Sequence, residues 1–211
     1  PATRTGRMDA PGATLCKPPG HTQLLAVRER GESELLGTTL DDAAGEAFDK
    51  GARLLGLGYP GGPLIDKHAK EGNPKAVAFP RGMRDSDNWN FSFSGVKTSL
   101  AYHVKKNPRF ILADVCASYQ EAIVEVLVVK AVRAAKTHQA VAIAASGGVS
   151  CNSRFRALLK LRCDESGLAL HMAPPNLCTD NAGMIAALAF HRFRGAGLDL
   201  SAVDISPNLK L

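Results

Sequence analysis

The sequence predicts an α/β fold, because short β-like runs alternate with loops and helical segments in its second half. The pattern is a strand at 140–145, a glycine loop at 146–152, a helix at 153–166, a strand at 168–172 and a helix at 180–194. Elements that alternate in this way pack as helices against a sheet. With 211 residues, 45% of them hydrophobic, the chain is long enough for a real core.

The first part of the chain gives weaker signals. Residues 1–19 show no period and predict an irregular leader. Apolar runs at 23–28 and 34–38 predict two strands joined by a turn. A helix is expected over 40–57, with Thr39 as its N-cap and two acids in its first turn.

The middle of the chain is predicted to be rich in helices. A sharp loop at 59–63 precedes a short helix at 64–72, and an irregular stretch at 73–94 precedes a helix at 95–105. The strongest helical signal lies at 113–137, where apolar residues recur at helical spacing. These residues are Val115, Tyr119, Ile123, Val126, Leu127 and Ala131.

Composition excludes several classes of protein. No apolar run approaches the roughly 20 residues of a membrane span, and residues 1–17 lack a secretory signal. The five cysteines are odd in number and show no CxxC spacing, which argues against a disulfide framework or a zinc knuckle. We therefore expect a soluble, cytoplasmic protein with reduced thiols and no membrane partner.

The net charge of +6 is concentrated in one segment. Residues 66–109 hold nine Lys or Arg against four Asp or Glu. Aromatic residues are interleaved with these bases, namely Phe79, Trp89, Phe91, Phe93 and Tyr102. Such a segment suits phosphates and stacked bases. It is equally typical of a solvated basic face with its aromatic side chains turned inward.

Two candidate ligand-binding residues, Asn152 and Asp49, lie near glycines. Asn152 ends the glycine loop, where it could pair with a sugar or base, or cap the next helix. Asp42, Glu46 and Asp49 have the spacing of one helix face, which Arg53 continues and could neutralise. Asp49 lies near the glycines at 61 and 62, so it could accept hydrogen bonds from ribose hydroxyls. The alternative is an ordinary solvated face.

Asp180 is the third polar candidate, at a strand-to-helix junction just after Cys178. It could be a metal ligand or a helix cap. The six histidines show no HxxxH or HExxH spacing, so no complete metal site is evident. GxSxG is also absent, which argues against a serine hydrolase.

Taken together, six segments in order resemble one family, the bacterial TsaD family of tRNA adenosine threonylcarbamoyltransferases. The segments cover roughly residues 20–190 and are specific as a set. They are GHTQL at 20–24, LDDAAGEAFDK at 40–50, YPGGP at 59–63, FSFSGVKT at 91–98, GGVxxN at 147–152, and CTDN at 178–181 with MIA at 184–186.

The resemblance implies an actin/Hsp70-like (ASKH) fold with ribonuclease-H-like lobes, in which residues 20–211 form the second lobe with a helix-rich insertion at about 63–137. It implies transfer of a threonylcarbamoyl group from threonylcarbamoyl-adenylate to N6 of the adenosine 3′ of the anticodon in tRNA. By motif position, Gly20, Asp49, Gly62 and Asn152 would bind the adenylate. Asp180 would be a ligand to one divalent metal ion, iron or zinc.

The match also implies partners and an incomplete chain. A paralogous ASKH subunit and a small ATPase are expected partners, besides tRNA and the adenylate. The family's N-terminal lobe, with its HxxxH pair, is not in this sequence, so we expect weak metal binding and little transfer by this chain. The prolines at 18 and 19 stand where the family has Ser-Gly. The alternative function is a non-catalytic ASKH scaffold or nucleotide-binding subunit.

Overall fold

The computed structural model describes residues 12–16, 22–29, 32–178 and 182–192. The chain divides into two compact units, one ending at Asp180 and the other beginning at Asn181. The fold and site below belong to the first unit. The described part of the second unit is one helix, α6 (Ala182–Arg192).

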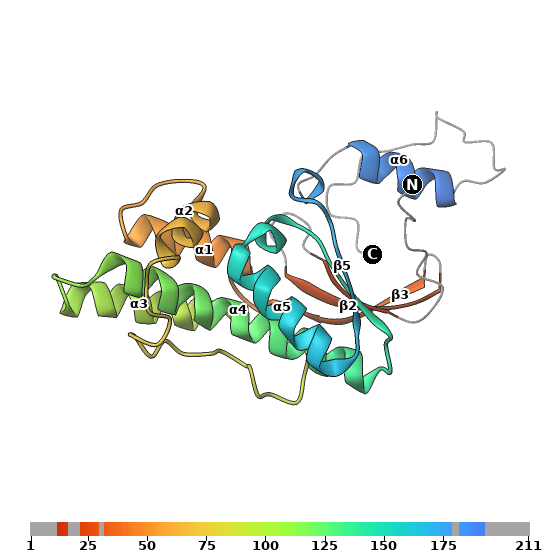
Figure 1. Cartoon of the computed structure of the whole chain (residues 1–211), viewed down its shortest axis with the longest axis horizontal. Coiled ribbons are helices and arrows are strands. Elements are labelled where there is room, and N and C mark those ends of the chain that lie inside the picture. Colours follow the sequence, from red (N-terminus) through yellow and green to blue (C-terminus); the bar gives the residue numbers. More distant parts are fainter. Residues whose placement is uncertain (1–11, 17–21, 30–31, 179–181, 193–211) are drawn as a thin grey trace. The chain divides into compact units, whose positions relative to one another are not determined.

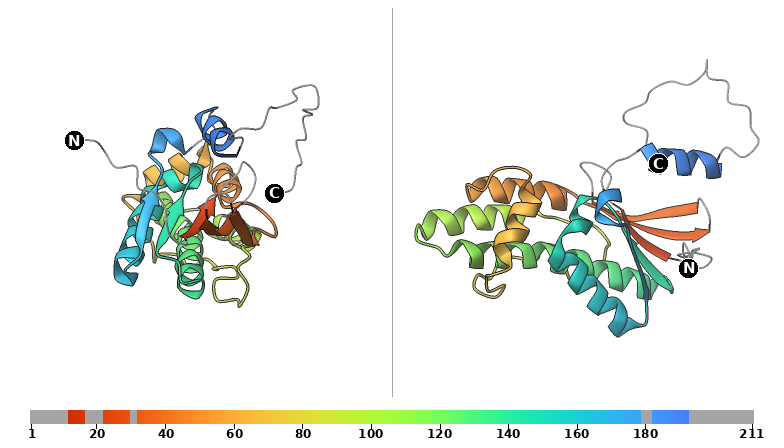
Figure 2. Two further views of the ribbon diagram at one scale, coloured as in Figure 1. Left: turned by 90° about the vertical axis from the view of Figure 1, so that its right-hand side faces the viewer. Right: turned by 45° about the horizontal axis from the view of Figure 1, so that its top comes forward.

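Within the described residues, five strands form one mixed sheet in the order β3-β2-β1-β4-β5 (Figures 1 and 2). β2 is antiparallel to β1 and β3, whereas β4 and β5 run parallel to β1. Gly12 pairs with Val27 of β2 and with Ala142 of β4, so β1 is the central strand. The strands are β1 (Gly12–Cys16), β2 (Gln23–Glu29), β3 (Glu32–Thr38), β4 (Ala142–Ala145) and β5 (Ala169–Met172).

The helices of the first unit form the rest of its core. They are α1 (Ala44–Leu54), α2 (Gly61–Ala69), α3 (Ser94–Lys106), α4 (Leu112–Thr137) and α5 (Ser153–Ser166), with the short 3-10 turns η1 (Gly148–Cys151) and η2 (Pro175–Leu177). The predictions for α3, α4 and α5 are confirmed to within one residue at each end. None of the helices in the described part of the chain combines the length and apolar character needed to cross a bilayer.

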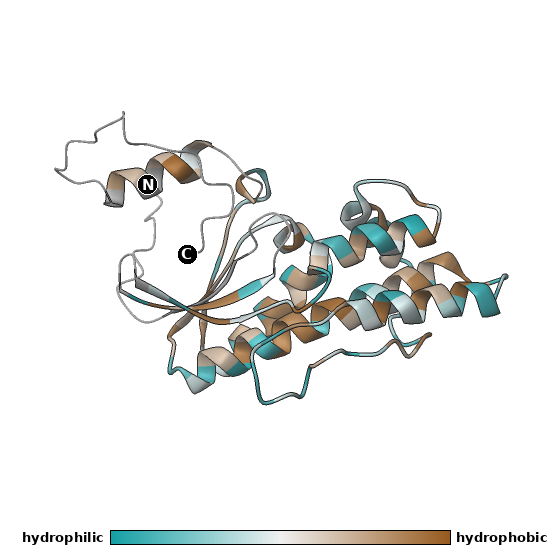
Figure 3. Ribbon diagram, turned by 180° about the vertical axis from the view of Figure 1, so that it is seen from behind, coloured by the Kyte–Doolittle hydropathy of each residue, from teal (hydrophilic) through white to brown (hydrophobic). Residues whose placement is uncertain are grey.

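The helix α4 joins the sheet to the other helices. It contacts β1 and β4, lies beside α5, and continues past the sheet to contact α2 and α3 (Figures 1 and 2). All six of its periodic apolar residues are buried, and Figure 3 shows hydrophobic ribbon concentrated along it. Each fully buried large side chain contributes roughly 1.5–3 kcal/mol. The core is therefore built around one long helix.

Two sequence predictions are wrong at the N-terminal side. Residues 12–16 were predicted to lie in an irregular leader, but they form β1; a central strand need not alternate, so no period reveals it. The helix predicted from residue 40 begins at Ala44, and Thr39 is not its N-cap. Backbone hydrogen bonds from Thr39 to Thr22 and from Leu40 to Phe91 hold these two residues outside the helix.

The start of α1 is completed instead by a distant side chain. Thr22 Oγ1 accepts a hydrogen bond from the backbone N–H of Ala44 at 2.9 Å. The predicted loop at 59–63 is also shorter than expected, because α2 already begins at Gly61. The reason is close packing of α2 on α1, which becomes clear at the site.

Candidate functional site

Asp49 of α1 lies at the first residue of α2. Its Oδ1 accepts a hydrogen bond from the backbone N–H of Gly61 at 2.8 Å, while its Oδ2 has no hydrogen-bond partner among the described residues. The two helices come this close because residue 61 has no side chain: a Cβ there would lie 2.6 Å from Asp49 Cα and 2.6 Å from the Phe48 oxygen. A Cβ at Gly62 would meet nothing within 4 Å. Asp49 and Gly62 thus lie together, and Gly62 faces open space.

Asn152 has both ends of its side-chain amide occupied. Its Oδ1 accepts the backbone N–H of Phe155 at 2.9 Å, which makes it the N-cap of α5. Its Nδ2 donates to Gln120 Oε1 of α4 at 2.6 Å. The side chain is nearly buried, with 7% exposed. Of the two roles that the sequence left open for Asn152, the structure contains the cap.

A carboxylate that sequence reasoning missed connects these two places. Asp66 of α2 accepts hydrogen bonds from the Ser153 backbone N–H at 3.2 Å and from Ser153 Oγ at 2.7 Å. Ser153 follows Asn152 and is the first residue of α5, and η1 just before it contacts α1. The structure therefore brings Asp49, Gly62 and Asn152 into one neighbourhood. No local sequence pattern predicts the role of Asp66, because its partner Ser153 is 87 positions away in the sequence.

The glycine loop leaves β4 through Gly147, whose φ of 88° requires a glycine. Ser150 Oγ donates to the Gly147 oxygen at 2.6 Å and closes the turn. Beside the loop, a hollow of about 460 Å³ lies at the carboxyl ends of β4 and β5. Its lining includes Ala145, Ser146, Met172 and Ala173. This edge of a sheet is where α/β proteins place ligands.

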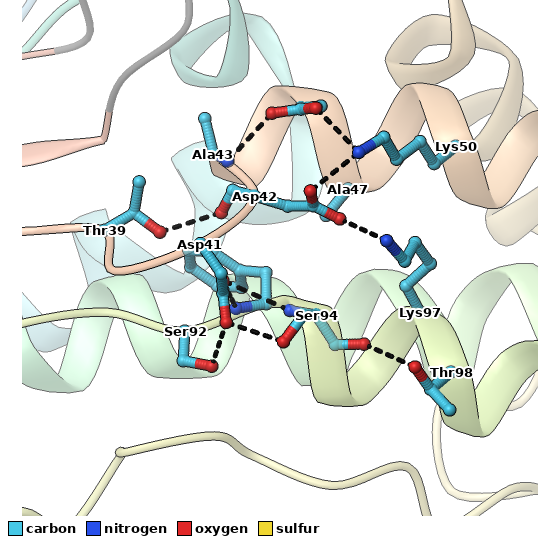
Figure 4. Close-up of polar contacts among 12 residues, drawn as sticks. Thr39, Asp41, Asp42, Ala43, Ala47, Lys50, Ser92, Ser94, Lys97 and Thr98 are labelled. Atoms are coloured by element: carbon cyan, nitrogen blue, oxygen red, sulfur yellow. Dashed lines mark hydrogen bonds and ion pairs between the residues drawn. The ribbon is translucent and has the colours of Figure 1, made fainter.

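Asp41 binds the start of α3 rather than standing in the first turn of α1 (Figure 4). Its carboxylate accepts hydrogen bonds from Ser92 Oγ and Ser94 Oγ, both at 2.6 Å, and from the backbone N–H groups of Phe93 at 2.8 Å and Ser94 at 3.2 Å. Burial alone would raise the pKa of Asp41, but these hydrogen bonds favour the charged form and lower it. A carboxylate thus completes the N-terminus of α3.

Asp42 points the other way, between two lysines (Figure 4). Its oxygens lie 2.7 Å from Lys50 Nζ and 2.8 Å from Lys97 Nζ. Burial opposes the charge, yet both lysines lower the pKa of Asp42. Lys50 also pairs with Glu46 at 2.7 Å, and its two carboxylate partners raise the pKa of Lys50 to about 12. Lys50 and Lys97 neutralise Asp42 and Glu46, the role that the sequence suggested for Arg53.

These contacts join two of the six sequence segments directly. Asp41 and Asp42 belong to LDDAAGEAFDK at 40–50, whereas Ser94 and Lys97 belong to FSFSGVKT at 91–98. The signal that could have revealed the pairing was complementary chemistry: adjacent acids in one segment, hydroxyls and a lysine in the other. The prediction that Asp42, Glu46 and Asp49 share one helix face is wrong for Asp42, which precedes the helix.

Comparison with known proteins matches this arrangement to one family. A profile described as tRNA N6-adenosine threonylcarbamoyltransferase (TsaD) matches residues 2–187, most of the chain. This chain belongs to the TsaD family. The match begins ahead of residue 20, so the sequence expectation that residues 1–19 fall outside the family pattern does not hold.

Curated relatives with that name are about half identical to this chain. The one from Thermotoga neapolitana is 48% identical over 91% of this chain, and the one from Anaeromyxobacter dehalogenans strain 2CP-1 is 53% identical over 87%. The chain covers 59% and 57% of their respective lengths. A crystal structure of T. kodakarensis HypF matches 76% of this chain, and 20% of its own, with a TM-score of 0.53 and 18% identity. That likeness shows a shared mixed α/β fold.

The basic segment of this TsaD-family chain has its aromatic side chains mostly turned inward. Phe79, Phe91 and Phe93 are buried in the core, while Tyr102 is 71% exposed. Five cations nevertheless lie exposed near one end of the helices without an ion pair among the described residues. They are Lys70, Lys75, Lys105, Lys106 and Arg109, here called the basic tip.

Contacts between the helix ends hold the basic tip together. Gly72, just after α2, packs against the Ala113 backbone at the start of α4, and the Asn73 N–H donates to Asp114 Oδ1 at 2.8 Å. Lys105 and Lys106 end α3, and Arg109 lies in the turn between α3 and α4.

Two predicted site residues, Gly20 and Asp180, lie outside the described residues.

Proposed function

We propose that this chain takes part in threonylcarbamoyl transfer to tRNA. In that reaction, N6 of the adenosine 3′ of the anticodon attacks the carbamoyl carbon of threonylcarbamoyl-adenylate. The bond from that carbon to the adenylate phosphate oxygen breaks, AMP leaves, and N6 loses a proton. Family membership supports the reaction class. The observation that carries the proposal is the placement of Asp49 and Gly62 at one exposed helix start, next to the cap of α5.

Within this proposal, Asp49 and Gly62 form the nucleotide contact. Asp49 Oδ2 is available to accept hydrogen bonds from ribose hydroxyls, while Oδ1 stays on Gly61. Gly62 lets a ligand approach the backbone of α2 closely. Asn152 would act mainly by positioning, because its amide already holds α5 and Gln120. Gly20 remains proposed for the phosphate end.

The finer fold assignment also belongs to the proposal. The mixed five-stranded sheet, with α4 and α5 packed together against it, supports a ribonuclease-H-like lobe of the ASKH type. The proposed helix-rich insertion, at about 63–137, would hold most of α2 and all of α3 and α4. A paralogous ASKH subunit, a small ATPase partner and a cytoplasmic location are proposed with it.

A divalent metal, iron or zinc, is proposed with Asp180 as one ligand. Among residues 12–16, 22–29, 32–178 and 182–192, no group of three His, Cys, Asp or Glu is placed to hold a metal ion. Those residues do not fit a metal site by themselves, since such sites use about three protein ligands. We derive no step through a metal. Elemental analysis of the purified chain should give well under one iron or zinc per chain; a full equivalent would contradict the expectation.

The basic tip is proposed as a surface for the tRNA backbone. Its five cations are exposed and unpaired by acids within the described residues, so they can contact phosphates. Replacing Lys105 and Lys106 by Glu should weaken tRNA binding and lower the salt slope by about 1 per lost phosphate contact. Lys136→Glu, a like change at the far end of α4, is the matched control. An equal loss of tRNA affinity in both variants would refute the proposal that the basic tip binds tRNA.

Calorimetric titration of the full chain with AMP tests the nucleotide site. Asp49→Asn and Gly62→Ala should each weaken AMP binding about tenfold or more, by removing a charged acceptor or filling the approach. Glu46→Gln removes a carboxylate from the same helix that pairs only with Lys50 and the Ala43 N–H, so it should bind AMP as the wild type does. AMP affinity unchanged in Asp49→Asn would overturn the assignment.

The alternative is a non-catalytic nucleotide-binding or scaffold subunit. One observation favours this alternative: the side chain of Asn152 has a structural role, because it caps α5 and binds Gln120. A transfer assay with tRNA and threonylcarbamoyl-adenylate separates the two functions. We expect little transfer by this chain alone, and full activity of this chain would overturn that expectation.

A further inference from the structure

Two cysteines from different loops meet beside the glycine loop. Cys151 ends η1 and is exposed, whereas Cys178 follows η2 and is buried. Cys151 occupies one of the variable positions of the GGVxxN segment, so the family resemblance assigns it nothing. Both are free thiols, as are Cys116 and Cys163 in the core.

The contacts of the two thiols place them as neighbours. Cys151 Sγ lies 3.7 Å from the Pro175 oxygen, and the backbone N–H of Cys178 donates to the same oxygen at 3.2 Å. Ser150 Oγ, one residue before Cys151, lies 3.1 Å from Cys178 Sγ. The Cys178 thiol is also an interaction partner of the Cys151 thiol. Both cysteines sit on short turns and loops.

A guanidinium stands beside this pair. Arg156 Nη2 lies 3.7 Å from Cys178 Sγ and donates to the Ala173 oxygen at 2.7 Å. Its Nε is buried and has no hydrogen-bond partner in the described part of the chain. Burial and the Cys178 thiol raise the pKa of Cys151, and the positive charge of Arg156 partly offsets them. Cys116 and Cys163 have no arginine contact of this kind within the described residues.

We propose that Cys151 and Cys178 are a modification site, forming a reversible disulfide with an oxidant of the glutathione disulfide class. The exposed Cys151 thiolate attacks glutathione disulfide, forms a mixed disulfide and releases one glutathione. The Cys178 thiolate then attacks Cys151 Sγ and releases the second glutathione. The two protein thiols lose two protons and two electrons, and glutathione disulfide is reduced to two glutathione molecules.

The bond would tie the glycine loop to the loop that follows β5. Both loops border the hollow at the carboxyl ends of β4 and β5, so the disulfide would fix that edge of the sheet. The proposal does not depend on the transfer reaction, because the bond itself is what is measured.

The test incubates the full chain with glutathione disulfide, alkylates the remaining thiols and digests without reduction. Mass spectrometry with fragmentation should find a linked peptide pair joining Cys151 to Cys178, lost after dithiothreitol. Cys178→Ser and Cys178→Ala should instead leave Cys151 as a stable glutathione adduct. Cys151→Ser, an exposed change, should leave Cys178 alkylated. Cys116 and Cys163 serve as internal controls and should stay alkylated.

Two results would overturn the proposal. One is wild-type chain that accumulates the Cys151 adduct to the same level as the Cys178 variants, because Cys178 then does not resolve it. The other is wild-type chain in which both thiols stay fully alkylated while glutathione disulfide oxidises a reference dithiol peptide in the same tube.

Discussion

Adjacent glycines at the start of α2 should respond oppositely to the same substitution. In Gly61→Ala, the new Cβ would lie 2.6 Å from Asp49 Cα, 2.6 Å from the Phe48 oxygen and 2.8 Å from Ala52 Cβ. Two of these three atoms are backbone of α1, so no rotamer change relieves the contact. The helices must separate by about 1 Å to reach an ordinary contact of ~3.5–4 Å.

The cost of that separation follows from two terms. Overpacking of this kind costs about 1–3 kcal/mol. The 2.8 Å hydrogen bond from Gly61 to Asp49 would stretch as well, which adds about 1 kcal/mol. For a chain of this size, each kcal/mol lowers Tm by about 2–4 °C, so Gly61→Ala should melt roughly 4–16 °C earlier.

Gly62→Ala is the matched control for stability. Its Cβ meets nothing within 4 Å, and alanine suits a helix better than glycine by up to about 1 kcal/mol. Its Tm should therefore equal or slightly exceed that of the wild type, measured by circular dichroism and checked by urea unfolding. If Gly61→Ala melts with the wild type, or if both variants lose Tm equally, then α2 does not pack on α1 as described.

Two further variants test contacts that hold loops onto helices. Asp41→Asn removes the anion at the start of α3, so the amides of Phe93 and Ser94 should exchange hydrogen faster. Hydrogen bonds lower the pKa of Asp41, so its contribution to the free energy of unfolding is full above the unfolded pKa of 3.8 and is lost as pH falls through the folded pKa. In urea unfolding from about pH 5 to 2, the free energy of unfolding should therefore fall less steeply in Asp41→Asn than in the wild type. Lys130→Met should cost about 1–3 kcal/mol in urea unfolding, because the buried Nζ binds the Asn88 oxygen, the Asn90 oxygen and Ser86 Oγ. Burial and Arg133 lower the pKa of Lys130 to about 8, so the unfolded chain binds more protons above that pH. Wild-type stability should then rise from about pH 8 to 10.5, and a rise of equal size in Lys130→Met would contradict this.

Local signals were sufficient for most of the helical core. The helix α5 begins after its N-cap Asn152 and ends at Gly167, whose φ of 66° stops the helix. One residue at each end therefore determines its boundaries. The helix α4 was predicted from periodicity because its six periodic apolar residues are all buried in the core. Where a helix is set by its own caps and pattern, the sequence predicts it.

Long-range contacts account for the errors. The start of α1 depends on Thr22 and Phe91, which lie far from it in the sequence and bind the residues that precede the helix. The strand β1 depends on β2 and β4 on either side of it. Gly61 and Gly62 look alike in sequence, yet only the position of α1 distinguishes the packing glycine from the open one. No window of neighbouring residues contains this information.

The site itself divides into residues that can meet a ligand and residues that hold them in place. Asn152 is buried, and its amide already caps α5 and binds Gln120. Asp49 keeps one oxygen available and stands beside the open position of Gly62. Loss of Asn152 should therefore lower stability together with nucleotide affinity, whereas loss of Asp49 Oδ2 should act on affinity far more than on stability. Comparing the two losses separates positioning from contact, which motif membership alone cannot do.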